Sequence, residues 1–327
     1  MTDARDARPI IVMLDDYERS FRALADWSGI DRLASVRVEH APLYGDALLA
    51  ALVDASAIVL QRDRTPFPGE LIDQLPKLEY LVFTGSRNTA LDLDALNQRG
   101  IPVSFSGRAA TRDGTCEIAW ALIFAAVKRL ETNFALMRAG GWRETGRLPG
   151  SLAGERFGII GLGDIGRQMA RIAQAFGMEV VAWSPHMTPE RARECGCVAV
   201  PLDELLSSSI VVSLHIVPSE STYRLLDAKR LALMRPEAIL VNTARAELID
   251  TAALIDALDA GRPGAAALDV FDTEPLAHDH PLRQRADVVL TPHLGFVIRP
   301  VLETFARGVV ECLSAWLEGR PLLRTLG

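Results

Sequence analysis

The sequence predicts an α/β protein of two domains, each built on a mostly parallel sheet with helices on both faces. The first reason is length, because 327 residues are more than one ordinary hydrophobic core accommodates. The second is that short apolar runs alternate with longer amphipathic stretches along the whole chain, an order typical of strand–helix–strand units. The third is a composition of 49% hydrophobic and 24% charged residues, which is that of a globular protein.

Eight short apolar runs are predicted to be strands. They are Ile10–Met13, Ala57–Leu60, Leu78–Phe83, Phe157–Gly161, Val180–Ser184, Val211–His215, Ile239–Asn242 and Val288–Thr291. Amphipathic stretches between the strands are predicted to be helices. These include Asp92–Arg99, Arg167–Phe176, Thr251–Ala260, a long helix from about Thr115 to Leu136 and a terminal helix from about Pro300 to Leu317.

Charge and hydropathy exclude several classes of protein. The formal net charge is -7 and no basic stripe is present, so a nucleic-acid partner is not expected. The longest apolar run, Ile118–Val127, is about half of what a membrane span needs, so no membrane association is expected. The segment Met1–Arg8 is polar and lacks a secretory signal, and of the four cysteines only Cys195 and Cys197 are close. We therefore expect reduced thiols, no metal site and a cytoplasmic location.

A glycine motif follows the predicted strand that begins at Phe157. It reads Gly161-x-Gly163-x-x-Gly166 and leads directly into a predicted helix and then another strand. The first glycine permits a tight turn, the second lets a pyrophosphate approach the backbone, and the third lets the helix pack against the strand. The phosphates then meet the free amides of the helix N-terminus, including those of Asp164 and Ile165. This context predicts a dinucleotide site in a Rossmann-like domain.

One position departs from the dinucleotide pattern. The strand after the motif should end in an acidic residue that accepts hydrogen bonds from the ribose hydroxyls. Ser184 stands in that place, and a serine does not repel a 2′-phosphate. His186, Arg191 or Arg193 can add positive charge nearby, although both arginines also fit the solvated face of a helix. The expected cofactor is therefore NAD or NADP, with NADP as acceptable as NAD or preferred.

The segment Ala139–Ala153 contains glycines and a proline and interrupts the pattern before the glycine motif. We predict a substrate and catalytic domain of residues 1–106, completed by the terminal segment 298–327. Residues 107–297 are predicted to form the dinucleotide-binding domain. A chain that passes between two domains twice encloses a cleft, where ligands commonly bind.

Polar residues follow three apolar strands after the glycine motif, at the edge where ligands of open α/β sheets bind. Arg245 follows the first, Glu274 the second and His293 the third. An arginine fork binds a carboxylate bidentately, and a histidine exchanges a proton near neutral pH. A carboxylate beside the histidine orients its ring. This set matches hydride transfer to a 2-oxo acid.

Each of these residues also has an ordinary structural interpretation. Taken alone, Arg245 fits a helix cap, Glu274 a surface loop and His293 a hydrogen-bonded loop histidine. Their shared placement at strand ends, behind a dinucleotide loop, favours the catalytic interpretation.

The chain resembles the D-isomer-specific 2-hydroxyacid dehydrogenases, which include glyoxylate/hydroxypyruvate reductases and phosphoglycerate dehydrogenases. The most specific matching segments are Gly161–Gly166, Asn242–Arg245, Ala267–Leu276 and Thr291–Gly295. By this resemblance Arg245 binds the substrate and is catalytic, Glu274 is the partner of the histidine, and His293 is the acid/base. The implied substrate is a small 2-oxo or (2R)-2-hydroxy acid, and the implied assembly is a homodimer through the cofactor domain.

The resemblance also assigns residues around the cofactor and the substrate. Asp269 matches the contact to the nicotinamide carboxamide, and His215 and Thr243 match residues beside the cofactor. The loop after Phe83 matches the place where backbone amides hold the substrate carboxylate. The substrate-binding residues expected in that loop are Ser86, Arg87 and Asn88.

Two departures from the family concern the substrate side. Arg87 and Asn88 stand where many members have further glycines, and Ala246-Glu247 replaces a common Gly-Gly. They leave the identity of the 2-oxo acid open. No further domain follows the terminal helix, so a long phosphoglycerate dehydrogenase of the serine pathway is not expected.

Thr115 and Glu117 open the predicted long helix and allow two interpretations. By the resemblance they lie near the cofactor and the dimer interface, and by local pattern they are an N-cap and a first-turn acid.

Two other functions remain open on the sequence. One is a dinucleotide-sensing dimer of the co-repressor kind, which would not require the Arg245, Glu274 and His293 set. The other is a dehydrogenase of a non-carboxylate donor such as formate or phosphite.

Overall fold

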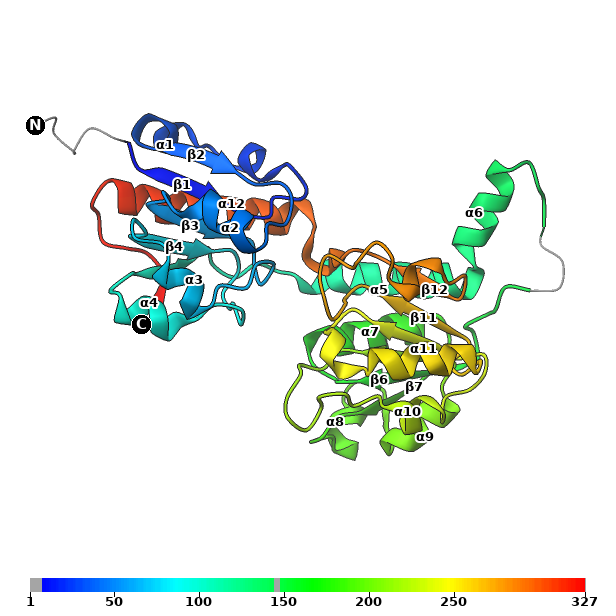
Figure 1. The fold of residues 1–327 in the computed structure, drawn as a ribbon. Coiled ribbons are helices and arrows are strands. Elements are labelled where there is room, and N and C mark those ends of the chain that lie inside the picture. Colours follow the sequence, from blue (N-terminus) through cyan, green and yellow to red (C-terminus); the bar gives the residue numbers. More distant parts are fainter. Residues whose placement is uncertain (1–7, 144–147, 327) are drawn as a thin grey trace, which may run out of the picture. The chain divides into compact units, whose positions relative to one another are not determined.

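A computed structural model describes residues 8–143 and 148–326 (Figure 1). The chain divides into two compact units, Met1–Ala110 with Ile298–Gly327, and Thr111–Val297. Among the described residues, no helix is both long and apolar enough to cross a membrane.

The first unit is built on a six-stranded sheet in the order β13-β5-β4-β3-β1-β2. The strands are β1 (Ile10–Met13), β2 (Ser35–Val38), β3 (Ala57–Leu60), β4 (Tyr80–Phe83), β5 (Val103–Phe105) and β13 (Thr325–Leu326). All neighbours are parallel except the short β13, which runs antiparallel to β5 at the edge.

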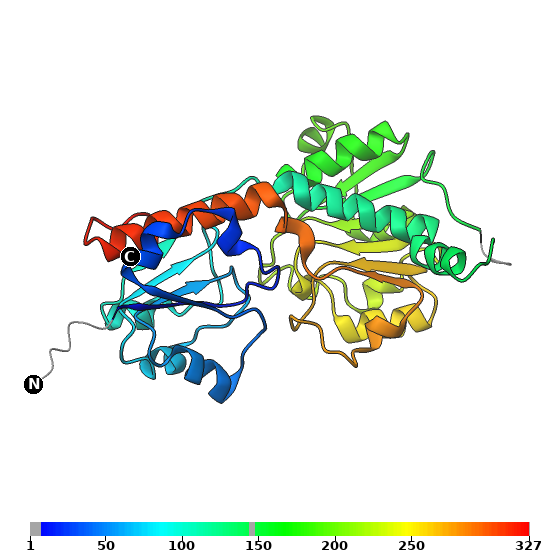
Figure 2. The same ribbon diagram turned by 90° about the horizontal axis from the view of Figure 1, so that it is seen from above.

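Helices cover both faces of this sheet (Figure 2). On one face the apolar sides of α2 (Gly45–Leu52), α3 (Gly69–Asp73) and α4 (Leu93–Gln98) pack on the strands. Contacts of α12 (Arg299–Leu317) with β4 and β5, and of α1 (Ser28–Leu33) with α12, cover the other face. There Trp316 of α12 stacks on Tyr80 of β4 with ring centroids 5.5 Å apart.

The second unit is a seven-stranded, fully parallel sheet in the order β12-β11-β10-β9-β6-β7-β8. The strands are β6 (Arg156–Ile160), β7 (Glu179–Trp183), β8 (Val198–Ala199), β9 (Val211–Leu214), β10 (Ile239–Asn242), β11 (Ala265–Leu268) and β12 (Val288–Leu290). The chain order reverses between β6 and β9, which is the switch point where such sheets bind ligands.

Alternate side chains of these strands serve two cores, as a period of two requires. Phe157 and Ile159 of β6 pack with α5 (Arg112–Lys128) and α7 (Asp164–Ala175), whereas Ile160 packs on the opposite face. That opposite face is covered by α9 (Leu202–Ser208), α10 (Ala228–Leu231) and α11 (Thr251–Asp259). The remaining helices of the unit are α6 (Leu130–Arg138), α8 (Pro189–Arg193), η2 (Ala246–Leu248), η3 (Pro281–Gln284) and η4 (Leu294–Phe296). The predicted class, two mostly parallel sheets covered by helices, is confirmed.

Two helix predictions were wrong in detail. The single helix expected over Thr115–Leu136 starts at Arg112 and breaks at Arg129, whose φ of 51° lies in the left-handed region and ends α5. A second helix, α6, then stands away from the sheet of its own unit (Figure 1). The helix after the glycine motif begins at Asp164 and not at Arg167, because the extended Gly163 is its N-cap residue.

Candidate dinucleotide and catalytic site

The glycine loop joins β6 to α7 as a turn that side chains would block. Gly161 has a φ of 101°, and a Cβ there would lie 2.6 Å from the carbonyl oxygen of His215. A Cβ on Gly166 would lie 2.1 Å from the carbonyl oxygen of Gly161. By contrast, a Cβ on Gly163 would have no neighbour within 4 Å, so space for a ligand adjoins the turn at this glycine. The three glycines therefore fit a bound pyrophosphate.

The start of α7 offers donors to that space. The first i to i−4 bond of the helix is donated by the Arg167 amide to the Gly163 carbonyl at 2.9 Å. The amides of Asp164, Ile165 and Gly166 precede this bond, so they are among the free donors at the positive end of the helix dipole. A cluster of open amides beside an open glycine suits a phosphate group.

Ser184 follows β7 directly beside the glycine turn. The Gly161 amide donates to the carbonyl of Trp183, the last residue of β7, at 2.8 Å. Ser184 is half-buried and His186 is exposed on the loop that leads to α8. The hydroxyl of Thr188 accepts from the Arg191 amide, so Thr188 is the N-cap residue of α8.

His215 directly follows β9, and Thr243 directly follows β10. His215 donates its amide to the carbonyl of Ile160, and its Nε2 lies 2.8 Å from the hydroxyl of Ser213. Removal of its ring from water lowers the pKa of His215 to about 3, so the ring is neutral at physiological pH. The buried hydroxyl of Thr243 has no hydrogen-bond partner within the described part of the chain. Such an orphan group is expected where a ligand supplies the partner.

His293 and Glu274 form a direct pair after β12 and β11. The Nδ1 atom of His293 lies 2.7 Å from Oε2 of Glu274, and the other oxygen of Glu274 accepts from the Phe271 amide at 2.9 Å. Both side chains are about one-third exposed. The ring of Phe296 meets the imidazole edge-on at 5.5 Å. Because Nδ1 is occupied, Nε2 is the nitrogen left to exchange a proton.

Arg245 follows β10, the strand next to β11. Its backbone is fixed by Asn242, whose Nδ2 donates to the Arg245 carbonyl at 2.8 Å and whose Oδ1 accepts from the Ala244 amide. The side chain uses Nη1 for the Ala244 carbonyl. The three predicted catalytic residues therefore follow three adjacent strands of one sheet, at the same edge as the glycine loop.

Asp269, which is expected beside the nicotinamide carboxamide, is a buried residue that directly follows β11. Its Oδ1 accepts from the Thr291 hydroxyl at 2.6 Å and from the Leu294 amide at 2.7 Å, and its Oδ2 accepts from the Gly295 amide at 2.9 Å. Burial raises the pKa of Asp269, while these bonds and His293 act in the opposite direction. The carboxylate is thus bound to the turn that carries His293.

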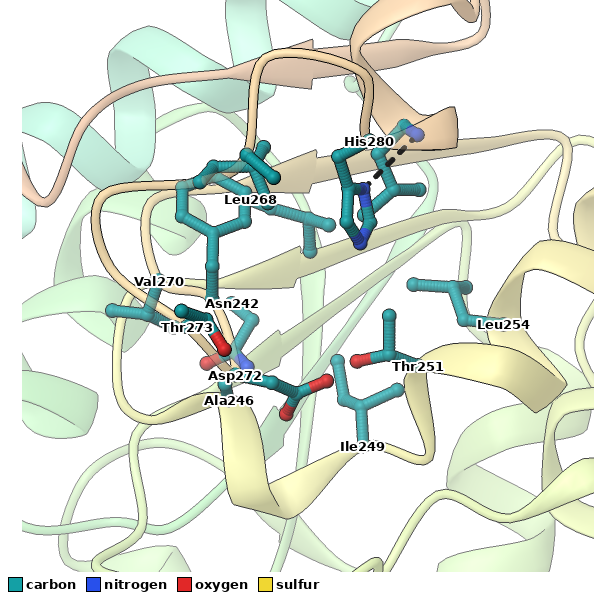
Figure 3. A pocket seen from close by; sticks show the side chains of 14 residues that line it. Asn242, Ala246, Ile249, Thr251, Leu254, Leu268, Val270, Asp272, Thr273 and His280 are labelled. Carbon is teal, nitrogen blue, oxygen red and sulfur yellow. Dashed lines mark hydrogen bonds between the residues drawn. The ribbon is translucent and has the colours of Figure 1, made fainter.

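A pocket of about 200 Å³ lies next to the segments that carry Arg245 and Glu274 (Figure 3). Its walls come from η2, the start of α11 and the loop after β11, and His280 faces into it. Ala246 and Phe271 of the lining are neighbours of Arg245 and Glu274, but the glycine loop does not line the pocket. It is therefore separate from the dinucleotide site.

The predicted substrate loop lies in the first unit, after β4. The Gly85 amide donates to the Ser106 hydroxyl at 3.0 Å, so this donor is not open to a substrate. The side chain of Asn88 is also used internally, donating to the Arg62 carbonyl at 2.8 Å and accepting from the Ala90 amide. The amides of the next residues, from Ser86 to Asn88, make no hydrogen bond to an acceptor in the described chain.

Arg62 is a neighbour of this loop that the sequence analysis did not identify. Its amide donates to the Thr84 hydroxyl at 2.9 Å, and its Nη1 would lie 2.7 Å from a Cβ on Gly85. Arg62 follows β3, the strand paired with β4. The strand-end rule that located Arg245 could have identified it.

The fold and the site define an α/β dinucleotide-binding protein with a histidine–carboxylate pair at the ligand edge of its sheet. Residues 120–295 match the family described as D-isomer specific 2-hydroxyacid dehydrogenase, NAD binding domain. A glyoxylate reductase of Thermococcus litoralis is 35% identical over 257 residues, which cover 76% of this chain and 77% of the relative. A putative D-3-phosphoglycerate dehydrogenase from Ralstonia solanacearum has a crystal structure that superposes with a TM-score of 0.87. It is 33% identical, and the match covers 95% of this chain and 94% of that one.

The chain belongs to the D-isomer specific 2-hydroxyacid dehydrogenase family. The D-3-phosphoglycerate dehydrogenase of Mycobacterium tuberculosis is 35% identical over 274 residues, or 84% of this chain. The matched part is 51% of that relative, so the chain spans about half the length of the mycobacterial enzymes.

Proposed function

We propose that this protein is an NAD(P)-dependent D-2-hydroxyacid dehydrogenase that reduces a small 2-oxo acid and oxidises the corresponding 2-hydroxy acid. The observation that carries the proposal is the 2.7 Å pair of His293 and Glu274, at the same edge of the sheet as the glycine loop. The cofactor would be held by the glycine loop and the start of α7, with Ser184, His215 and Thr243 around it. When bound, the nicotinamide supplies a hydride to the carbonyl carbon or accepts one from the hydroxyl-bearing carbon.

The protein groups have separate roles in this reaction. His293 donates a proton from Nε2 to the carbonyl oxygen during reduction and takes it back during oxidation. Glu274 accepts a hydrogen bond from Nδ1–H, which orients the ring. Arg245 binds the substrate carboxylate with its guanidinium fork and polarises the adjacent carbonyl.

The loop after β4 is proposed to bind the same carboxylate from the first unit. The unengaged amides from Ser86 to Asn88 support this role, because an anion can accept from several adjacent amides. Arg87 is exposed and adds a positive charge to the loop. The Asn88 side chain supports the loop by its bonds to Arg62 and Ala90.

A panel of 2-oxo acids assayed with NADH and NADPH in parallel tests the activity and the cofactor together. We expect turnover with at least one acid of the glyoxylate, hydroxypyruvate or bulkier aliphatic type, and NADPH at least as efficient as NADH in kcat/KM. The half-buried Ser184 supports the expectation about NADPH, because its neutral side chain does not repel the negative charge of a 2′-phosphate.

The variant Ser184→Asp sharpens this cofactor prediction. A carboxylate at this position should lower kcat/KM with NADPH by about tenfold or more through repulsion of the 2′-phosphate, and should spare NADH. Thr188→Ser, which keeps the hydroxyl that caps α8 in the same loop, serves as the neighbouring control for a general disturbance of the loop. A strong preference of the unmodified protein for NADH would rule out the cofactor proposal and leave the dehydrogenase proposal intact.

We also propose that the protein is a homodimer formed through the second unit. Helix α6 has no buried residue, and Phe134 and Met137 on it are 55% and 53% exposed. Trp142 beyond its end is 73% exposed. Exposed apolar groups of this size commonly mark an interface. A groove of about 730 Å³ between α5 and α7 is lined partly by aromatic side chains, including Trp120 and Phe176, and suits such an arm from a second copy.

The double variant Phe134→Glu/Met137→Glu tests the dimer. Sedimentation at micromolar concentration should give about twice the 35.6 kDa chain mass for the unmodified protein and the single-chain mass for the variant. Tyr44→Glu, at an exposed aromatic residue of the first unit, should remain dimeric. A stable monomer of the unmodified protein would contradict the dimer. A double variant that remains dimeric would mean that Phe134 and Met137 of α6 do not form the interface.

A cytoplasmic location is proposed as well. Its support is that Cys116, Cys195, Cys197 and Cys312 are all free thiols, which suits a reducing compartment.

A further inference from the structure

The turn that carries His293 is fastened from two sides. It follows β12 and contains η4, and His293 itself has a φ of 53°, in the left-handed region. This conformation is unfavourable for a residue that carries a side chain. It persists only where the surroundings impose it.

Asp269 fastens the turn on one side. Three donors of the turn, the Thr291 hydroxyl and the amides of Leu294 and Gly295, bind its two oxygens at 2.6–2.9 Å. A carboxylate offers about four lone-pair positions, so most of its capacity is used within the turn.

Thr115 fastens the turn on the other side. It lies in α5, is 8% exposed, and its hydroxyl is 2.9 Å from the Gly295 carbonyl oxygen, which is 180 residues away in the sequence. The same hydroxyl is 3.0 Å from the Thr111 carbonyl. Thr115 is therefore inside the helix and is not its N-cap residue, so that interpretation of the sequence was wrong.

Both Asp269 and Thr115 form hydrogen bonds with the backbone of Gly295. Its amide donates to Asp269 and its carbonyl accepts from Thr115. A Cβ there would lie 3.3 Å from Oδ2 of Asp269 and 3.5 Å from the Thr115 hydroxyl. The backbone two residues after His293 is thus held between β11 and α5.

The histidine ring contacts Phe296 of the same turn edge-on. Its hydrogen bond to Glu274 fixes Nδ1, and the side chain is 31% exposed. Where Nε2 points therefore depends on where the backbone of the turn is held. Catalytic groups lose activity when their supporting contacts allow about 1 Å of displacement.

We propose that Thr115 is a positioning residue for His293, acting through the carbonyl of Gly295 together with Asp269. The proposal rests on the proposed function of His293 as the acid/base. It assigns Thr115 to the catalytic turn and not to the cofactor.

The test compares Thr115→Val with Thr115→Ser. Valine keeps the shape but removes the donor, which leaves the buried Gly295 carbonyl without this partner. We expect kcat to fall about tenfold in Thr115→Val, while the Kd for NADPH or NADH, measured by quenching of protein fluorescence, stays within twofold. Thr115→Ser should restore kcat to within twofold of the unmodified protein.

Thr304→Val is the matched control. The hydroxyl of Thr304 donates to the Pro300 carbonyl at 2.8 Å, four residues back in α12, and makes no bond to the catalytic turn. Thr304→Val removes only a hydroxyl bond to the carbonyl four residues back in the helix, as Thr115→Val also does. The kcat of Thr304→Val should therefore equal that of the unmodified protein.

Three results would overturn the positioning role. One is a kcat of Thr115→Val within twofold of the unmodified protein, while His293→Ala is inactive. Another is a loss of cofactor affinity in place of kcat, which would assign Thr115 to the cofactor site. If Thr115→Val does not fold, Thr291→Val replaces it in the test, because this variant removes the bond of the Thr291 hydroxyl to Asp269 in the same turn. A kcat of Thr291→Val equal to that of the unmodified protein would be the third contradicting result. Full activity of His293→Ala would instead refute the proposed function.

Discussion

Replacement of His293 by alanine is expected to lower kcat for reduction of the 2-oxo acid by about 10²–10⁴-fold, the usual contribution of general acid–base catalysis. Nε2 of the imidazole is free to give the proton. Both oxygens of Glu274 are already engaged, one by Nδ1 of His293 and the other by the Phe271 amide. Cofactor affinity should remain within a few-fold, since the glycine loop belongs to β6 and α7. Steady-state kinetics and a fluorescence titration with the reduced cofactor measure the two effects.

The control for this variant is His280→Ala. His280 lies in the same unit, and its Nδ1 accepts from the Leu282 amide at the pocket behind the site. It should retain most of the activity, because it contributes to a local cap and not to the histidine–glutamate pair. Normal turnover of His293→Ala in an enzyme free of contaminating activity would refute the assignment of the acid/base.

The fold could be predicted because its strands are buried on both faces. Val211–Leu214 and Ile239–Asn242 are fully buried central strands, and such strands appear in the sequence as nearly continuous apolar runs. Three of the strands that were not predicted lack this signal. Ser35–Val38 at a sheet edge alternates between exposed and half-buried residues, and β8 and β13 have two residues each.

The break between α5 and α6 shows a second limit of the sequence. The stretch from Thr115 to Leu136 contains neither proline nor glycine, so the local sequence does not predict that the helix ends at Lys128. The helix ends because Arg129 adopts the left-handed conformation and its amide bonds to the Ala125 and Ala126 carbonyls. α6, which follows, buries none of its residues against its own unit, so no packing pattern in this chain marks its position.

Much of the candidate site followed from one rule, that ligand-binding residues lie at the carboxyl ends of parallel strands. The rule placed His293 and Glu274 together although 19 residues separate them. It did not find the contact of Thr115 with Gly295, because that contact joins a helix to a turn and depends on how α5 packs. It also did not show that the hydrogen-bonding capacity of Asp269 is largely used by the protein, which only side-chain geometry reveals.

The variant Arg245→Lys is expected to lower kcat/KM for the 2-oxo acid by about 100-fold, although the charge is conserved. A lysine cannot form the two parallel bonds to a carboxylate that the planar guanidinium provides. Hydrogen bonds to charged groups contribute about 1.5–3 kcal/mol each, so the loss of one or two accounts for an effect of this size. Both a higher KM and a lower kcat are expected, because the arginine is proposed to bind the substrate and to polarise its carbonyl.

The fold around position 245 should tolerate the change to lysine. The Asn242 side chain holds the backbone there by two bonds, and the guanidinium contributes one bond, to the Ala244 carbonyl. The unfolding temperature of the variant should therefore match that of the unmodified protein. Arg224→Lys is a suitable control, since Arg224 is a 57% exposed partner of Asp250 in an ion pair and such pairs contribute little. A kcat/KM within threefold of the unmodified value in Arg245→Lys would mean that a point charge suffices. The carboxylate would then have to be recognised mainly by the amides after β4, and variants of Ser86 and Arg87 would become the decisive ones.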